Sequence, residues 1–450
     1  MSRLYGRLTV AGAAATQHER WEDVDALRAV AALSVLAAHS FLLGGSHPPA
    51  QSAASYAVSN AIACGVWLFF AISGFLIAGP FLTALVRGGP LPPIGRFAVR
   101  RAARILPAYW VALAAILILV TGNQIMHFWQ VPVHALLLQS LVPNETQRLY
   151  FVAWTLGVEA VFYALVPLGA VLVRRARGAR PLSIDRVGAV LTALWAFSVV
   201  WGIALSLAHP FGPTKAMPAA FTVLYLVPPL GNFCPGMLVF LALTPEGRSR
   251  GGWWERGRQL CASPAKALSL AAVCWLLSQK LHWQSDPLAF ALFYPLVGVA
   301  SGLALGSVLS GKWLTRVREA LAPVGLVSYG IYLWHWVILA VLLDHHIYPV
   351  SSFGGPASVI HAIVLLVLTL PVALLSWLVI ERPLLRRTTL WDRGGGQALR
   401  RAARAAPDAE RPDPSAAAAA PAARAAAAGD RQAGGPRPAG SRSERPAARS

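Results

Sequence analysis

The residues best suited to do chemistry in this sequence are the few ionisable side chains that interrupt its long apolar stretches. They are Arg28, His39, Arg101, Arg104, Glu159 and His335. An ionisable group inside a bilayer costs at least about 2.5 to 3.5 kcal/mol on insertion scales, so one that is kept there is a candidate for function. Histidine titrates near neutral pH and suits proton transfer, whereas arginine stays charged and suits phosphate oxygens.

Three ionisable residues share one face of the first apolar stretch. At about 100° per residue, Asp25, Arg28 and His39 fall at roughly 0°, 300° and 320° around a helix. At about 1.5 Å per residue, His39 lies about 21 Å along the axis from Asp25, so this carboxylate cannot reach the imidazole. An acidic partner for His39 must come from another helix, and Glu159 is the only other carboxylate within a predicted span. Alternatively, His39 makes a polar contact between helices without catalysis.

Arg101 and Arg104 form a pair near the start of another apolar stretch. They are three residues apart, so their side chains lie on one face of a helix. Two guanidinium groups in this arrangement can hold phosphate oxygens through paired hydrogen bonds. The alternative is that they anchor the chain at lipid headgroups, which is the usual role of arginines at the end of a span.

Other candidate groups are assigned structural roles. Ser73 stands in a Ser-Gly pair without a base at a helpful spacing, which predicts a helix-packing point rather than a nucleophile. His335 lies among aromatic residues, and we interpret it as part of an interfacial aromatic belt. The consecutive Asp344, His345 and His346 predict no metal site, because adjacent residues rarely converge on one ion. The four cysteines form no CxxC pair, so neither a zinc site nor a disulfide framework is expected.

Composition indicates that a membrane must position these residues. The 450 residues are 56% hydrophobic and only 13% charged, which is about half the charge of a soluble protein of this size. The formal net charge of +20 could suggest a nucleic-acid partner, but the basic residues are confined to particular segments. We therefore interpret the charge as a signal of membrane topology and expect no nucleic acid.

Scanning for apolar runs of about 20 residues predicts ten membrane-spanning helices, hence an all-α polytopic bundle. The runs lie at 24–43, 62–86, 105–121, 149–172, 187–207, 217–243, 264–280, 288–311, 321–343 and 357–380. Alternate connecting loops hold 18 Lys or Arg on one side and 3 on the other. Because basic residues collect on the cytoplasmic side, an even number of spans places both termini in the cytoplasm.

Three regions follow from this scan. Residues 1–23 are predicted to be a cytoplasmic N-terminal segment, and residues 24–387 the membrane domain. Residues 388–450 contain Ala, Pro, Gly and Arg with almost no large apolar residues, which predicts a disordered cytoplasmic tail. The apolar segment 127–141 is too short to span and is predicted to be a surface or re-entrant helix.

The order of motifs along the chain resembles the acyltransferase 3 family of bacterial integral membrane O-acyltransferases. The similarity extends from Val24 to about Arg387. It rests on the segments Asp25–His39, Val66–Ile77, Arg101-Ala-Ala-Arg104 with Pro107, Trp154–Tyr163, Ser328–His335 and Glu381-Arg-Pro383. Each segment is weak alone, but six in the right order on a ten-span scaffold are hard to obtain by chance. One departure from many members is that no hydrolase-like domain follows the tenth span.

The resemblance implies a catalytic role for His39, donor binding by Arg101 and Arg104, and supporting roles for Arg28 and Glu159. Together with the spacing, it assigns His39, Glu159 and Asp25 to catalysis and Arg28, Arg101 and Arg104 to donor binding, with no metal and no permanently bound cofactor.

The family further implies that acyl-coenzyme A, usually acetyl-coenzyme A, is the donor and enters from the cytoplasm. The acceptor would be a hydroxyl of a glycan, glycolipid or glycosylated metabolite, and the location the bacterial inner membrane. His39 would act as general base. Two alternatives stay open: a proton-coupled transporter or exporter of a glycoconjugate or organic acid, and a scaffold or polymerase of surface polysaccharide.

Overall fold

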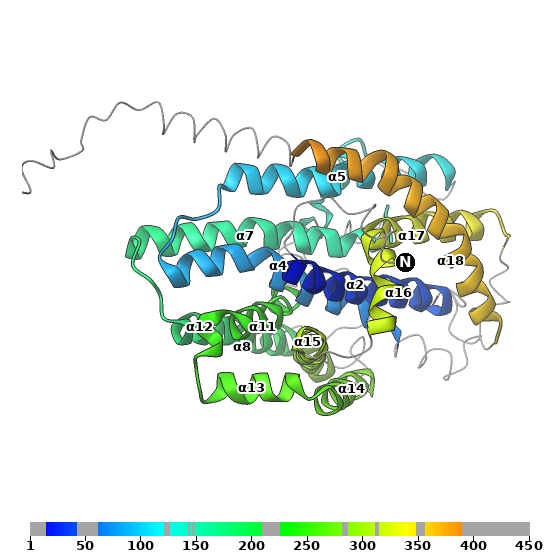
Figure 1. The fold of residues 1–450 in the computed structure, drawn as a ribbon. Helices are drawn as coiled ribbons and strands as arrows, with labels where there is room; N and C mark the ends of the chain where they lie inside the picture. Colours follow the sequence, from blue (N-terminus) through cyan, green and yellow to red (C-terminus); the bar gives the residue numbers. More distant parts are fainter. Residues whose placement is uncertain are drawn as a thin grey trace, which may run out of the picture. The chain divides into compact units, whose positions relative to one another are not determined.

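The computed structural model of the protein describes residues 15–42, 62–120, 127–142, 145, 149–208, 226–280, 287–310, 315–347 and 356–388. All regular elements in these ranges are helical, and no strand occurs among them (Figure 1). The predicted all-α class is therefore confirmed for the described part of the chain. Residues 1–14 of the predicted N-terminal segment and the predicted tail from residue 389 onward lie outside the described residues.

The longer helices provide the framework, and shorter elements connect them. The longer ones are α2 (Ala15–Leu42), α4 (Gly65–Arg87), α5 (Ile94–Leu119), α7 (Trp154–Arg177), α8 (Ile184–Ala208), α14 (Pro264–Lys280), α15 (Pro287–Ser310), α17 (Ser328–Asp344) and α18 (Pro356–Ser376). The shorter ones are α6 (Gln130–Ala135), η1 (Gln139–Leu141), η2 (Phe151–Ala153), α10 (Val227–Gly231), α11 (Cys234–Leu243), α12 (Pro245–Arg248), α13 (Trp253–Ala262), α16 (Thr315–Leu326) and the π-helical η4 (Trp377–Glu381). The predicted short helix at 127–141 corresponds to α6 and η1.

Six helices in the described ranges are long and apolar enough to cross a membrane, and two bent helix pairs raise the number to eight. The pairs are α13 with α14, bent by 97°, and α16 with α17, bent by 63°. Two of the ten predicted spans are not among these eight. One falls on α2, and the other, 217–243, is described only in part, as the shorter apolar stretch Val227–Leu243. The chain is a multi-pass membrane protein.

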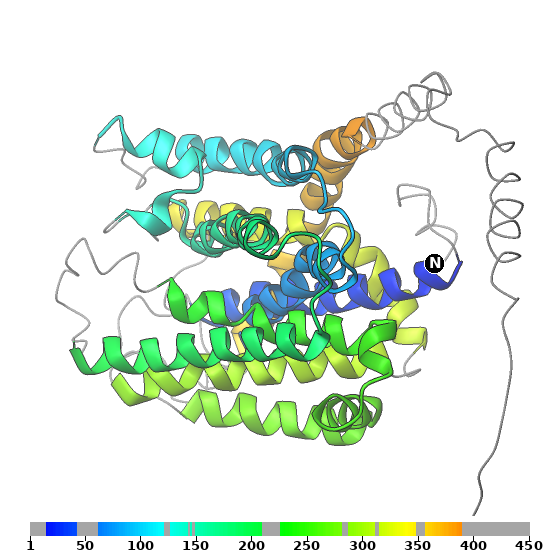
Figure 2. The same cartoon turned by 90° about the vertical axis from the view of Figure 1, so that its left-hand side faces the viewer.

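Helices α2 and α4 lie at the centre of the bundle. Helix α2 packs against α4, α16, α17 and α18, and α4 also packs against α7, α11 and α15. A Cβ atom on Gly65 would collide with the carbonyl oxygen of Ala31, and one on Gly325 with that of Asp25. Small residues at crossing points let membrane helices approach closely. In both ribbon views, α5 lies on one side of this centre and α13 with α14 on the other (Figures 1 and 2).

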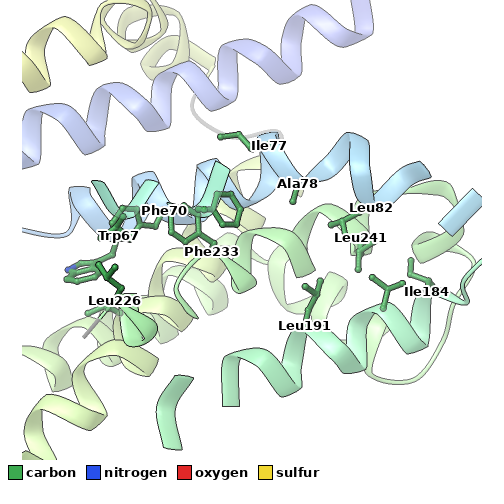
Figure 3. Close-up of a cluster of buried hydrophobic side chains, with 14 of the residues drawn as sticks. Trp67, Phe70, Ile77, Ala78, Leu82, Ile184, Leu191, Leu226, Phe233 and Leu241 are labelled. Carbon is green, nitrogen blue, oxygen red and sulfur yellow. The ribbon is translucent and has the colours of Figure 1, made fainter. Parts of the chain in front are cut away.

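A cluster of aromatic and aliphatic side chains joins α4 to α7, α8, α11 and α15 (Figure 3). Phe233 stacks on Phe162 with ring centroids 3.9 Å apart and on Phe70 with centroids 4.8 Å apart. Such ring pairs contribute about 0.5 to 1.5 kcal/mol each beyond the area they bury. A Cβ atom on Gly74 would collide with the Phe233 carbonyl, so the close-packing residue of the Ser-Gly pair is Gly74.

Several arginine-rich segments meet at one end of the bundle. Helix α4 ends at Gly88, which adopts a φ of 71° that glycine tolerates without strain. Arg174 of α7 donates to the carbonyl oxygens of Ala84 and Gly88, and Arg87 pairs with Glu246 of α12 at 2.7 Å. The loops after α4, α7 and α11 therefore lie together, and we refer to this as the basic end.

Candidate active site

A cavity of about 100 Å³ lies between α2, α4, α5, α7 and α17. A buried water needs roughly 10 to 15 Å³ of such volume, so the cavity can hold several waters or one small anionic group. Most of its polar lining comes from residues that the sequence singles out. Its lining includes Arg28, Ser73, Arg101, Arg104, Glu159 and Tyr332. We call it the arginine cavity.

The two arginines of α5 reach this cavity because their spacing places both on one helical face. The Arg101 guanidinium lies over the rings of Phe97 and Tyr163, 5.7 and 5.8 Å from their centroids. Cation–π contacts of this kind contribute about 0.5 to 1 kcal/mol at exposed sites and more when desolvated. The aromatic rings therefore hold one guanidinium of the pair in place at the cavity wall.

Two carboxylates support the arginines without lining the cavity. Arg28 of α2 donates to Asp25 at 3.3 Å, one helical turn away. Glu381, at the end of the π-helical turn η4, is 2% exposed and interacts electrostatically with Arg104 and Arg28. A buried charge needs compensation of this kind. The arginines are therefore stabilised before any ligand binds, while their guanidinium groups still face the cavity.

Glu159 is the one carboxylate that lines the arginine cavity, and its partner is a hydroxyl group. The Ser73 hydroxyl donates to Glu159 Oε1, and the Tyr163 hydroxyl also bonds this carboxylate. Ser73 was assigned to helix packing from the sequence because no base is near it in the chain. The structure brings Glu159 of α7 to the Ser73 hydroxyl, a contact between helices that sequence spacing cannot reveal.

Near the C-terminal end of α2, His39 forms a pair with His335 of α17. Nδ1 of His39 lies 3.0 Å from Nε2 of His335, and the rings stack with centroids 5.2 Å apart and 21° between their planes. His335 is 0% exposed, and its Nδ1 lies 3.0 Å from the carbonyl oxygen of Ile331. His39 is only partly buried. The pair therefore combines one fully enclosed imidazole with one that is partly buried.

Two aromatic rings complete the surroundings of His39. Phe151 and Trp336 stack on each other with centroids 4.7 Å apart. Both rings lie nearly edge-on to the imidazole. The ring centroid of Phe151 is 5.9 Å from that of His39 with 86° between the planes, and the centroid of Trp336 is 5.3 Å away with 73° between the planes. These contacts fix the plane of the imidazole, and both aromatic side chains are themselves only partly buried.

Tyr332 lies between the arginine cavity and the histidine pair. It lines the cavity, and its ring centroid is 5.9 Å from that of His335. Its hydroxyl is bonded to Thr155 at 2.6 Å and to the carbonyl of Val152 at 2.7 Å. Helix geometry places Arg28 and His39 about 16 Å apart along α2. The site therefore has two parts on one helix, with a tyrosine between them.

The structure gathers most of the predicted residues but not all. Arg28, Arg101, Arg104 and Glu159 line one cavity, with Asp25 behind Arg28, whereas His39 stands apart. The structure does not pair Glu159 with His39, because helix α7 presents Glu159 to Ser73 of α4 and to the arginine cavity. This corrects the expected acidic partner for the imidazole.

One residue of the site received a different role from the sequence, and another was not singled out as a buried charge. His335 was assigned to an aromatic belt, yet it is buried and bonded to His39. Its signal was available, because it is an ionisable residue within a predicted span. Glu381 lies one residue beyond the last predicted span, 357–380, so it was not counted among the ionisable residues inside the membrane.

A separate buried polar cluster holds the segment that contains α6. His134 and Gln130 contact Glu145 at 3.1 and 2.8 Å, and Tyr109 donates to the His134 carbonyl. These bonds tie the segment to α5. Among the described residues, no group of three His, Cys, Asp or Glu could hold a metal ion.

Comparison with known proteins gives a family and several relatives. The model of the acyltransferase domain family matches residues 21–378. The exopolysaccharide production protein ExoZ of Rhizobium meliloti strain 1021 is 26% identical over 339 residues, covering 72% of this chain and 90% of that protein. BcsY of Komagataeibacter xylinus, whose name proposes a membrane-bound transacylase, is 25% identical over 389 residues, covering 81% of this chain and 82% of that protein.

A third relative carries a name that specifies a reaction. YrhL of Bacillus subtilis strain 168, whose name proposes a peptidoglycan O-acetyltransferase, is 26% identical over 418 residues, covering 82% of this chain and 56% of that protein. No solved structure matches the chain.

Proposed function

The chain belongs to the acyltransferase 3 family and is a membrane-bound acyltransferase, and from this premise we propose that it acetylates a carbohydrate hydroxyl group. The proposed donor is acetyl-coenzyme A. The acceptor is a hydroxyl of an exopolysaccharide or peptidoglycan-type glycan, a class suggested by the names of two relatives. The observation that carries the proposal is the division of the site, with a cavity lined by arginines at the middle of α2 and a partly buried histidine near the C-terminal end of that helix.

Donor binding is assigned to the arginine cavity. Arg101 and Arg104 present guanidinium groups from one face of α5, and Arg28 adds a third from α2. Charge-assisted hydrogen bonds from arginine to phosphate are short and strong. The cavity volume suits one phosphate group, so the rest of the coenzyme lies outside it. The pantetheine arm then extends along α2, past Tyr332, toward His39.

Proton transfer is assigned to His39. Its Nε2 takes the proton from the acceptor hydroxyl, and the oxygen attacks the thioester carbonyl of the donor. The tetrahedral intermediate then collapses, the C–S bond breaks, and the acetyl group stays on the acceptor oxygen. The proton on Nε2 passes to the departing thiolate, so coenzyme A leaves as the thiol and His39 returns to its starting state.

The aromatic pair beside His39 suits a carbohydrate acceptor. Phe151 and Trp336 are partly exposed and lie against the imidazole. The C–H faces of a sugar ring pack well on aromatic faces, while the hydroxyl groups stay free for hydrogen bonds. We therefore assign acceptor binding to this pair.

The distribution of basic residues gives the proposed orientation. Arginine-rich loops meet at the basic end, and the positive-inside rule assigns this end and both termini to the cytoplasmic side. Acetyl-coenzyme A is then supplied from the end at which α5, the helix of Arg101 and Arg104, begins. Protease added outside intact cells should leave an epitope at the C-terminus uncut, and its removal would contradict this orientation.

The proposed activity is tested by thioester consumption. Purified protein in detergent or liposomes should release coenzyme A from labelled acetyl-coenzyme A when a glycan acceptor is present. His39→Ala should lower this rate about 100- to 10,000-fold, the range expected for the loss of a general base. His345→Ala, which changes an exposed histidine, is the matched control. Wild-type activity in His39→Ala would refute the base assignment.

The transporter alternative predicts a different result in the same assay. A proton-coupled transporter would move a glycoconjugate or organic acid without consuming thioester. A relay between His39 and Glu159 would need the two groups to be in contact, but the structure places Glu159 against Ser73. Absence of coenzyme A release with every carbohydrate acceptor tried, together with substrate uptake by liposomes, would favour the transporter.

A further inference from the structure

The hydrogen bonds of the histidine pair determine where the protons lie. A carbonyl oxygen can only accept, so the contact from Ile331 requires His335 to carry its proton on Nδ1. In a neutral imidazole the other nitrogen then has a lone pair. Nε2 of His335 must therefore accept, and Nδ1 of His39 must donate. The remaining nitrogen of His39, Nε2, is left with the lone pair that a general base needs.

We propose that His335 is a positioning residue that holds His39 in the Nδ1–H tautomer, so that Nε2 of His39 is available as the base. This inference rests on the proposed function for its catalytic consequence. The tautomer itself follows from the chain of contacts from Ile331 through His335 to His39.

A histidine in this place acts differently from the carboxylate that usually orients a catalytic imidazole. When Nε2 of His39 takes a proton, Nδ1 can pass its own proton to Nε2 of His335. His335 would then be the imidazolium, still donating to Ile331 through Nδ1. The two rings thus share one positive charge, with no proton lost or gained.

The surroundings of His39 indicate that His335 is the group that shares its proton. Among the described groups, it is the one titratable side chain with an electrostatic effect on His39. The other groups at the imidazole are the backbone carbonyl of Val35, which can accept a hydrogen bond but cannot take up the proton, and the rings of Phe151 and Trp336. Tyr332 contacts His335 rather than His39, and its hydroxyl is bonded to Thr155 and Val152.

Two substitutions at His335 distinguish the effect of its hydrogen-bond acceptor from the effect of the space that its ring fills. His335→Leu keeps an apolar side chain but removes the acceptor for Nδ1 of His39. It should lower kcat about 100-fold and leave the donor KM unchanged. His335→Asn offers an amide oxygen to His39 and an NH₂ group to Ile331. Its kcat should therefore be at least about tenfold higher than that of His335→Leu. Equal activity of His335→Leu and wild type would overturn the proposal.

Nitrogen-15 spectra of histidine-labelled protein test the tautomer without using activity. The His39 signals are those that disappear in His39→Ala. In the wild-type protein they should show a protonated Nδ1 and an unprotonated Nε2, and in His335→Leu this preference should be lost. A wild-type His39 protonated on Nε2 would overturn the proposal, even if His335→Leu failed to fold.

These readouts also distinguish the two proposals. Full activity of His39→Ala would refute the base assignment, while the spectra would still report the tautomer. An inactive His39→Ala together with a wild-type rate and spectrum in His335→Leu would instead refute the role of His335 alone.

Discussion

The arginine cavity lies beside the middle of α2 and the histidine pair near its C-terminal end, and their buried polar groups are compensated in different ways. In the arginine cavity, Arg28 and Arg104 are permanent charges, and Asp25 and Glu381 compensate them. In the histidine pair, His39 and His335 can be satisfied as neutral groups by hydrogen bonds to each other and to a carbonyl. Fixed charge suits the holding of an anionic donor, whereas groups that change protonation suit proton transfer.

The comparison also explains why the two parts are separate. A guanidinium group beside the general base would disfavour its protonated form during catalysis. Arg28 and His39 lie about 16 Å apart along α2, so the arginine charge has little effect on the protonation of His39. A donor with its phosphates at one end and its thioester at the other can span both parts, because the pantetheine arm lies between them.

The largest expected effect in the cavity comes from the two arginines of α5. Arg101→Ala with Arg104→Ala should raise the KM for acetyl-coenzyme A about 100-fold, because each bond to a charged group contributes about 1.5 to 3 kcal/mol. The double lysine variant keeps both charges but loses the paired hydrogen bonds, so it should show an intermediate KM. Steady-state kinetics measure both.

The control for this prediction lies on the same helix. Arg100→Ala removes an exposed arginine that does not line the cavity, and its KM should match the wild type. If all three variants behaved alike, the arginines would be membrane anchors rather than donor ligands.

A smaller effect is expected at the acceptor side. Trp336→Ala should raise the KM for the glycan acceptor about tenfold, which corresponds to about 1.4 kcal/mol of lost contact. The KM for acetyl-coenzyme A should stay the same, because Trp336 lies beside His39 and not in the arginine cavity. Trp253→Ala, at an exposed tryptophan of α13, is the control. A larger change in donor KM than in acceptor KM would contradict the assignment of Trp336.

The smallest effect concerns stability rather than turnover. Ser73→Ala removes the hydroxyl that donates to Glu159, and bonds to charged groups contribute about 1.5 to 3 kcal/mol. Ser34→Ala removes a hydroxyl that donates to the carbonyl of Ala31, for which about 0.5 to 1.5 kcal/mol is expected. The thermal midpoint should therefore fall further in Ser73→Ala. Equal midpoints would indicate that the Ser73 bond contributes no more than a neutral one.

Sequence reasoning reached the helical class and most of the cavity for clear physical reasons. Charged residues in apolar runs are rare and costly, so Arg28, Arg101, Arg104 and Glu159 stood out by type and depth alone. The periodicity of α5 also placed Arg101 and Arg104 on one face. These predictions depend only on residue type and on spacing within one helix, which do not change when the helices pack together.

The contacts between helices could not be obtained in the same way. The partners Ser73 with Glu159 and His39 with His335 are 86 and 296 residues apart in the chain. Spacing along one helix gives no information about which faces of different helices meet. The bend between α16 and α17 interrupts a run predicted as one continuous helix at 321–343, so the orientation of α17 was also beyond the hydropathy scan.

The most direct test of this division of labour is calorimetric binding of coenzyme A to two variants. His39→Ala should bind coenzyme A with the wild-type Kd although its acetyl transfer is about 100- to 10,000-fold slower. Arg101→Ala with Arg104→Ala should lose about 100-fold in affinity while His39 remains in place. Loss of binding in His39→Ala, or wild-type binding in the double arginine variant, would contradict the account.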